Sequence, residues 1–198
     1  MSLRYFLPFY LFVYLLTTFI WRSFVVWKRT GINPVTFKGT DSAHDYIGRV
    51  FKVLFAVIVI VVLLYSFWPN VYRLLAPIEW LEQYWIKWIG VTLLTLSLGW
   101  TMVAQVQMGQ SWRIGIDERH RTVLVTEGVF GLSRNPIFLG MTFTLIGLFL
   151  CIPNAFTLLT LVLGFVLIQI QIRLEEEFLG RVHGQHYEHY SRKVRRWL

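Results

Sequence analysis

The stretch "PIFLGMTFTLIGLFLCIPNAFTLLTLVLGFVLIQIQI", residues 136–172, contains no Asp, Glu, Lys or Arg. A helix needs about 20 apolar residues to cross the hydrocarbon core of a bilayer. This stretch is long enough for two such helices, and Pro153 and Asn154 lie between them. Because these two residue types favour turns over helix interiors, the stretch predicts a tight helical hairpin within a membrane.

The rest of the chain has the same apolar character. Its 198 residues are 56% hydrophobic and only 15% charged, which is too apolar for a soluble domain of this length. We expect an all-α integral membrane bundle of about five transmembrane helices, at about residues 3–27, 50–69, 84–107, 136–152 and 155–173. The first is long and lacks a small-residue cleavage site, so we expect a retained helix instead of a signal peptide. The absence of internal repeats indicates a single membrane domain, residues 1–198.

The positive charges predict the orientation of these helices. Segments 28–52, 109–135 and 173–198, together with Arg22, hold 16 of the 19 Lys and Arg residues. Cytoplasmic flanks of membrane helices are enriched in these residues, so we expect an outside amino terminus and a cytoplasmic carboxyl terminus. The net charge of +8 is spread along membrane borders, which favours anionic lipids over nucleic acid as partners.

Polar residues concentrate in two of the cytoplasmic segments. Residues 108–136 lead into the fourth helix, and residues 173–198 continue the fifth, because no helix breaker occurs before Gly180. In an antiparallel hairpin with a two-residue turn, Arg134 and Asn135 must lie near the level of residues 173–176. The sequence therefore predicts one cytoplasmic pocket, built from residues 108–140 and 173–195.

The charged residues of this pocket also have purely structural interpretations. Arg134 suits the flank of a membrane helix, where its guanidinium would reach the lipid headgroups. Residues 175–177, all Glu, suit a solvated helix face that is paired with Arg173 and Arg181. Composition alone leaves both interpretations open.

A metal site is not expected. His183, His186 and His189 recur every three residues, but positions six residues apart on a helix diverge by about 120°. Three such ligands do not converge on one ion. Cys151 is the single cysteine, so it has no partner for an internal disulfide or a cysteine metal site.

The pocket segments resemble the membrane methyltransferase superfamily that includes isoprenylcysteine carboxyl methyltransferase and phospholipid N-methyltransferases. The resemblance rests on "RNPIFLG" (134–140), "EEEFL" (175–179), and the following Gly184, Tyr187 and Tyr190, with "VTEGVF" (125–130) and "GQSW" (109–112) upstream. It covers roughly residues 105–195. Asn135 and Phe138 stand where many members have His and Tyr, and the chain lacks the arginine-to-proline ending of many relatives. Bacterial-type members often tolerate Asn at the first of these positions, so we interpret the departures as subfamily differences, and we expect a bacterial inner membrane.

This resemblance implies S-adenosylmethionine as the cofactor and a lipid or other lipophilic molecule as the methyl acceptor. Carboxylates and aromatic faces suit a sulfonium cation. The cofactor-binding residues implied are Val125, Gly128, Val129, Arg134, Asn135, Pro136, Phe138, Glu175, Glu176, His186, Tyr187 and Tyr190. Arg173 and Glu176 are the expected catalytic residues, and Arg113 and Arg173 are the expected ligands of an anionic acceptor.

The acceptor and the reaction stay open at this point. A prenylcysteine-like carboxylate, a phospholipid amine and a hydrophobic thiol all suit a membrane-embedded enzyme. One alternative is an NADPH-dependent membrane reductase of the sterol reductase type, because Arg113, Arg119 and Arg121 suit the phosphates of that nucleotide. A second alternative is a non-catalytic membrane scaffold, given the departures at Asn135 and Phe138.

Overall fold

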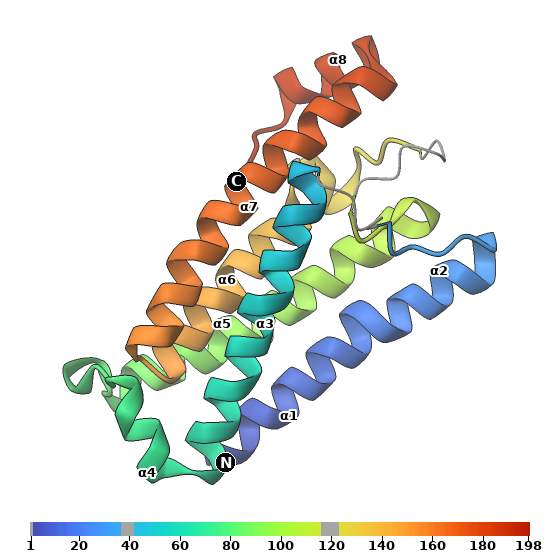
Figure 1. Ribbon diagram of the computed structural model, residues 1–198. Coiled ribbons are helices and arrows are strands. Elements are labelled where there is room, and N and C mark those ends of the chain that lie inside the picture. Colours follow the sequence, from blue (N-terminus) through green and yellow to red (C-terminus); the bar gives the residue numbers. More distant parts are fainter. Residues whose placement is uncertain (1, 37–41, 116–122) are drawn as a thin grey trace.

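The computed structural model describes residues 2–36, 42–115 and 123–198. Figure 1 shows a bundle of long helices with the amino terminus at one end and the last helix, α8 (Gln185–Lys193), at the other. Over the described ranges the secondary structure is helical, with two isolated β-bridges and no strand. Within the described residues, four helices are long and apolar enough to cross a membrane. The expected all-α membrane bundle is therefore confirmed.

The first long helix runs from Leu3 to Thr30 in three consecutive segments. They are α1 (Leu3–Leu15), the π-helical turn η1 (Leu16–Trp21) and α2 (Arg22–Thr30). The wide turn is tied to a neighbouring helix, because the Gln105 side chain donates to the Thr18 carbonyl at 3.0 Å. Such π-turns often accompany functional sites, and this one had no signal in the sequence.

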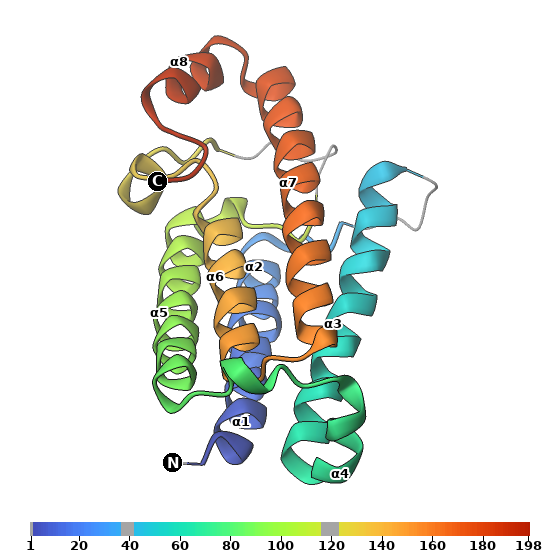
Figure 2. The ribbon, with the colours of Figure 1, turned by 90° about the vertical axis from the view of Figure 1, so that its left-hand side faces the viewer.

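Two long helices and a short irregular connection follow. Helix α3 (Ala43–Phe67) is capped by the Ser42 hydroxyl, which accepts from the Asp45 backbone at 3.2 Å. The connection contains α4 (Pro69–Tyr72) and two 3₁₀ turns, η2 (Arg73–Leu75) and η3 (Glu79–Leu81), and leads into α5 (Tyr84–Met108). It lies at the same end of the bundle as the amino terminus (Figure 2).

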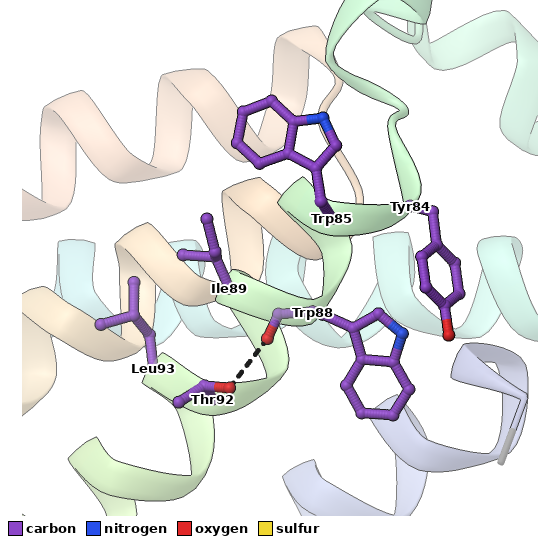
Figure 3. Close-up of a pocket in the computed structure, with 6 residues that line it drawn as sticks. All are labelled: Tyr84, Trp85, Trp88, Ile89, Thr92 and Leu93. Carbon is purple, nitrogen blue, oxygen red and sulfur yellow. Dashed lines mark hydrogen bonds between the residues drawn. The ribbon is translucent and has the colours of Figure 1, made fainter.

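The start of α5 carries exposed aromatic side chains. Figure 3 shows six neighbouring residues around a shallow apolar hollow, Tyr84, Trp85, Trp88, Ile89, Thr92 and Leu93. Tyr84 and Trp85 are 77% and 63% exposed. Because amphipathic rings anchor proteins at the membrane surface, this hollow fits an interfacial belt, and it has no ionisable side chain other than a tyrosine.

The hairpin predicted around Pro153 joins α6 (Pro136–Cys151) to α7 (Ala155–His183). The Asn154 side chain accepts hydrogen bonds from the backbone N–H groups of Phe156 and Thr157, at 2.9 and 3.0 Å. The Asn154 N–H in turn donates to the Thr157 hydroxyl at 3.1 Å. This reciprocal cap fixes the start of α7.

Two helix lengths differ from a simple reading of five spans. Helix α6 has 16 residues, or about 24 Å at 1.5 Å per residue, which is less than the hydrocarbon thickness of a bilayer. Helix α7 has 29 residues and continues past Gly180 to His183, ending at Gly184, whose φ of 52° is left-handed. The last turns of the long α7 therefore extend beyond the start of α6 (Figure 2).

Helices α5 and α6 form the tightest pair in the bundle. A Cβ at Gly90 would lie 2.7 Å from the Gly147 carbonyl oxygen and 2.9 Å from the Cys151 backbone nitrogen. At the other end of the pair, a Cβ at Gly140 would collide with the Thr101 hydroxyl. These glycines let the two backbones approach closely, as small residues do between membrane helices, and they hold the start of α6 in place.

Candidate functional site

Glu176, on the projecting part of α7, is held by side chains from two other segments. Asn135 Nδ2 donates to Glu176 Oε1 at 3.0 Å, and Arg134 Nη2 lies 3.4 Å from the same oxygen. Arg196 Nη2 donates to Oε2 at 2.7 Å, which raises the pKa of Arg196. Only 11% of the Glu176 side chain is exposed. As the hairpin geometry predicts, residues 134 and 135 meet Glu176, and charge-assisted bonds fix its carboxylate.

The carboxyl-terminal tail crosses this rim. The Arg134 N–H donates to the Arg195 carbonyl at 3.0 Å. The Arg196 carbonyl accepts from the Ser133 hydroxyl and from Asn135 Nδ2, both at 3.3 Å. The tail therefore binds the start of α6 through its backbone as well as through the Arg196 guanidinium.

A cavity of about 560 Å³ lies next to the rim. This volume is in the range of sites for cofactors and other small ligands. Its walls come from all the long helices, and its apolar part reaches Tyr10, Leu94 and Leu148 in the core of the bundle. The expected site residues that line it are Arg113, Val125, Arg134, Asn135, Pro136, Phe138, Glu175 and Tyr190. The cavity thus joins a polar rim to an apolar interior.

Glu175 lies on the cavity wall, in an environment unlike that of its neighbour Glu176. Gln171 Nε2 donates to Glu175 Oε1 at 2.9 Å and lies 3.3 Å from His44 Nδ1. No cation contacts the Glu175 carboxylate among the described residues. The adjacent glutamates therefore have different partners: Glu175 has one neutral amide, and Glu176 has two arginines and the Asn135 amide.

The two tyrosines of α8 pack against the rim from the other side. Their rings lie 6.1 Å apart in an edge-on arrangement, and the Tyr190 hydroxyl donates to the Phe130 carbonyl at 2.7 Å. Burial, and next the Glu176 carboxylate, raises the pKa of Tyr187 to about 12. Burial, and next Tyr187, raises the pKa of Tyr190 to about 12. Both hydroxyls are therefore neutral near pH 7.

Gly128 and Val129 lie behind the residues that line the cavity. They begin the 3₁₀ turn η5 (Gly128–Gly131), where Gly128 has a left-handed φ of 62°. The Val129 N–H donates to Gln107 Oε1 at 2.8 Å, and a Cβ at Gly128 would collide with that same side chain. Glycine at this position thus allows Gln107 to hold the turn.

Two expected site residues, Arg173 and His186, neither line the cavity nor contact its rim. Arg173 is exposed, and its guanidinium donates to the Gln169 carbonyl at 2.7 Å. Because Arg173 precedes Glu175 by two residues, or about 200° around a helix, the two side chains face opposite ways. His186 is exposed on α8 and does not line the cavity.

Two further predictions concern the arginines suggested for a nucleotide and the side chains that could bind a metal. Arg113 lines the cavity and donates to the carbonyls of Gln110 and Trp112, at 2.7 and 2.8 Å. Arg119 and Arg121 lie outside the described residues. Within residues 2–36, 42–115 and 123–198, no three His, Cys, Asp or Glu side chains are grouped as metal ligands.

The site residues that the sequence did not predict are Arg196, Gln171 and Gln107. Arg196 belongs to a basic run near the chain end, residues 192–196, which looks like an ordinary cytoplasmic flank. Gln171 had a usable signal, because it precedes Glu175 by one helical turn inside an apolar run. Gln107 had none, since its partner is a backbone N–H 22 residues away.

A family model described as phospholipid methyltransferase matches residues 85–186. A probable protein-S-isoprenylcysteine O-methyltransferase of Oryza sativa subsp. japonica is 31% identical over 121 residues, which cover 58% of this chain and 62% of the relative. Protein-S-isoprenylcysteine O-methyltransferase B of Arabidopsis thaliana is 28% identical over 119 residues, 57% of this chain and 59% of the relative. The chain thus matches about three fifths of each relative's length. No solved structure shows significant similarity.

Proposed function

The chain belongs to the phospholipid methyltransferase family, and from this membership we propose that it transfers a methyl group from S-adenosylmethionine to a lipophilic acceptor. The observation that carries the proposal is the cavity of about 560 Å³ that joins the Glu176 rim to the apolar core. A water-soluble donor and a lipophilic acceptor need such a boundary in order to meet.

The residues present suit the donor. When bound, S-adenosylmethionine supplies an electrophilic methyl group on a sulfonium. Its carboxylate fits Arg134, whose buried Nε has no hydrogen-bond partner among the described residues. Its sulfonium fits the Glu175 carboxylate and the neighbouring aromatic rings. The proposed donor site comprises Val125, Arg134, Asn135, Pro136, Phe138, Glu175, Glu176, Tyr187 and Tyr190, with Gly128 and Val129 behind it; the exposed His186 is left out.

The apolar part of the cavity suits the acceptor. The cavity walls between α1 and α7 are mostly hydrophobic. Arg113 lies at the polar end of the cavity. The plant relatives are named for isoprenylcysteine O-methylation, and we propose that a prenyl-like chain occupies this space. Arg113 is the proposed contact for an acceptor headgroup, and the outward-facing Arg173 is not part of the proposal.

Catalysis by this site would come mainly from positioning. Methyl transfer is an in-line displacement, and holding two reactants in line can contribute several kcal/mol, about 7–11 in the best cases. The bonds from Arg134, Asn135 and Arg196 keep Glu176 fixed before any ligand arrives. The apolar wall excludes water from the reacting atoms.

We propose that the rim faces the cytoplasm and the amino terminus the outside. The supporting observation is that residues 28–36, 109–115 and 173–198 gather at one end of the bundle (Figure 1). Labelling Ser191→Cys in a Cys151→Ala background, with a membrane-impermeant maleimide on intact cells, tests this; rapid labelling from outside contradicts it. The inner membrane of a bacterium stays a prediction, because the relatives reported above are plant proteins.

The proposed activity is tested with methyl-labelled S-adenosylmethionine and the purified protein in lipid vesicles. We expect label in the lipid extract with the wild type and at least a tenfold loss with Arg134→Ala, while Arg192→Ala, an exposed change on α8, keeps the wild-type rate. Donor binding without label in any lipid, prenylcysteine or thiol pool would favour a scaffold. Binding of NADPH alone would favour a reductase.

A further inference from the structure

A cluster of hydroxyl side chains lies where the apolar part of the cavity reaches the core of the bundle. Tyr10 on α1, Thr101 on α5 and Thr144 on α6 line the cavity there. Ser97, on α5, has its hydroxyl oxygen 2.9 Å from that of Thr144. The Tyr10 hydroxyl lies near these two but outside hydrogen-bond geometry. None of the four residues belongs to the proposed donor site.

Two hydroxyls of this cluster are explained by helix packing. Ser97 Oγ donates to the Leu94 carbonyl at 3.0 Å, and the Thr144 hydroxyl donates to the Gly140 carbonyl, also at 3.0 Å. The contact between Ser97 and Thr144 joins α5 to α6, as polar side chains do between membrane helices. Their hydrogen atoms are therefore already used within the protein.

The other two hydroxyls, those of Tyr10 and Thr101, are buried without a hydrogen-bond partner among the described residues. The two residues are 4% and 1% exposed. Three other threonines on the cavity wall, Thr18, Thr144 and Thr160, each donate to the carbonyl four residues earlier, at 2.6, 3.0 and 2.7 Å. Because buried polar groups nearly always have a partner, the two unpaired donors on the cavity wall indicate a ligand that carries an acceptor atom.

The surroundings favour a neutral acceptor atom at this depth. Segments 5–21, 88–112 and 136–151, which carry the cluster, contain no Asp, Glu, Lys or Arg. An unpaired charge within a membrane is costly. Along α6, Thr144 lies about 13 Å from Asn135 at the rim, at 1.5 Å per residue. A carbonyl oxygen, which has two lone pairs and no hydrogen, suits two free donors.

We propose that Tyr10 and Thr101 form a second binding site, deep in the cavity, which takes the carbonyl oxygen of a lipophilic ligand. The inference rests on the proposed function only in that the cavity holds such a ligand. A plain hydrocarbon chain, a prenyl chain included, fills the same space but leaves both hydroxyls unpaired. The site therefore selects among apolar molecules by one oxygen, whereas the rim binds the donor.

The test measures which of two matched kinds of probe the full chain retains. Detergent-purified protein is equilibrated with a linear long-chain alkane and with ketones of the same length, whose isotope-labelled carbonyl is stepped along the chain. Gel filtration and mass spectrometry then quantify the bound probes. We expect the wild type to prefer its best ketone over the alkane about tenfold more than Tyr10→Phe/Thr101→Ala does. The exposed changes Tyr5→Phe and Thr95→Ala, on the same helices, are the matched controls and should keep the preference.

Two further measurements separate ligand binding from a structural role. The infrared band of the labelled carbonyl should lie at lower frequency on the wild type than in detergent, because hydrogen bonds weaken the C=O bond, and the double variant should not shift it. Without probe, Tyr10→Phe should melt no lower than the wild type, since the hydroxyl that it removes has no partner.

Equal retention of ketone and alkane by the wild type, as a trapped water on the two hydroxyls would give, would overturn the inference and leave the proposed function intact. A ketone preference that persists in the double variant would overturn it in the same way. Retention of neither probe would overturn both the inference and the proposed acceptor space, while donor binding at the rim is measured separately.

Discussion

At the scale of single residues, the α8 tyrosines offer a matched pair. Tyr190 donates to the Phe130 carbonyl, whereas the buried Tyr187 hydroxyl has no hydrogen-bond partner among the described residues. Tyr190→Phe leaves a carbonyl without its donor, which costs about 1–3 kcal/mol. We expect a lower thermal midpoint for helix loss in detergent with Tyr190→Phe than with Tyr187→Phe. Equal midpoints would mean that this hydrogen bond does not hold α8.

The sequence predicts some contacts between single residues but not others. It predicts that Asn135 lies near Glu176, because helix length and a two-residue turn fix that geometry. It could not separate Glu175 from Glu176, since the partner that distinguishes them, Arg196, comes from the tail. Chain ends carry no periodic pattern, so their contacts cannot be read from spacing. The outward direction of Arg173, by contrast, follows from helix geometry once Glu175 is placed in the cavity.

At the scale of elements, the close approach of α5 and α6 sets the position of the rim. Gly90→Ala places a methyl group against the Gly147 carbonyl, and overpacking of this kind costs about 1–3 kcal/mol. Gly99→Ala, on the same helix, meets nothing within 4 Å, and should stabilise by up to about 1 kcal/mol through helix propensity. Thermal unfolding of both variants in one detergent measures the difference. A Gly90→Ala protein as stable as Gly99→Ala would show that the glycine contact is not tight in the membrane.

Elements were the most predictable part of this fold. Long apolar runs mark the helices, and Asn154 ends the hairpin turn with the cap that its side chain favours. The π-helical turn at Leu16–Trp21 was not predictable, because its residues are ordinary helix residues and its stabilising bond comes from Gln105 on another helix. The extension of α7 through Gly180 was also missed, since a lone glycine weakens a helix without ending it.

At the scale of the whole molecule, the bundle places a polar rim and an apolar interior on one cavity. The hairpin α6–α7 supplies both glutamates and the start of the rim, and the tail closes it with Arg196. The remaining helices complete the apolar walls. This arrangement accounts for the concentration of polar residues in two distant segments of an otherwise apolar chain.

Calorimetric titration of the detergent-purified protein measures whether this rim binds S-adenosylmethionine, as we propose. NADPH is titrated in parallel, and Glu176→Gln, Arg134→Ala and the exposed control Glu177→Gln are compared with the wild type after a check of helix content. We predict donor binding by the wild type and Glu177→Gln, at least tenfold weaker binding by the other two variants, and no heat from NADPH. No donor binding at millimolar concentration, or binding of NADPH in its place, would show that the rim is not an S-adenosylmethionine site.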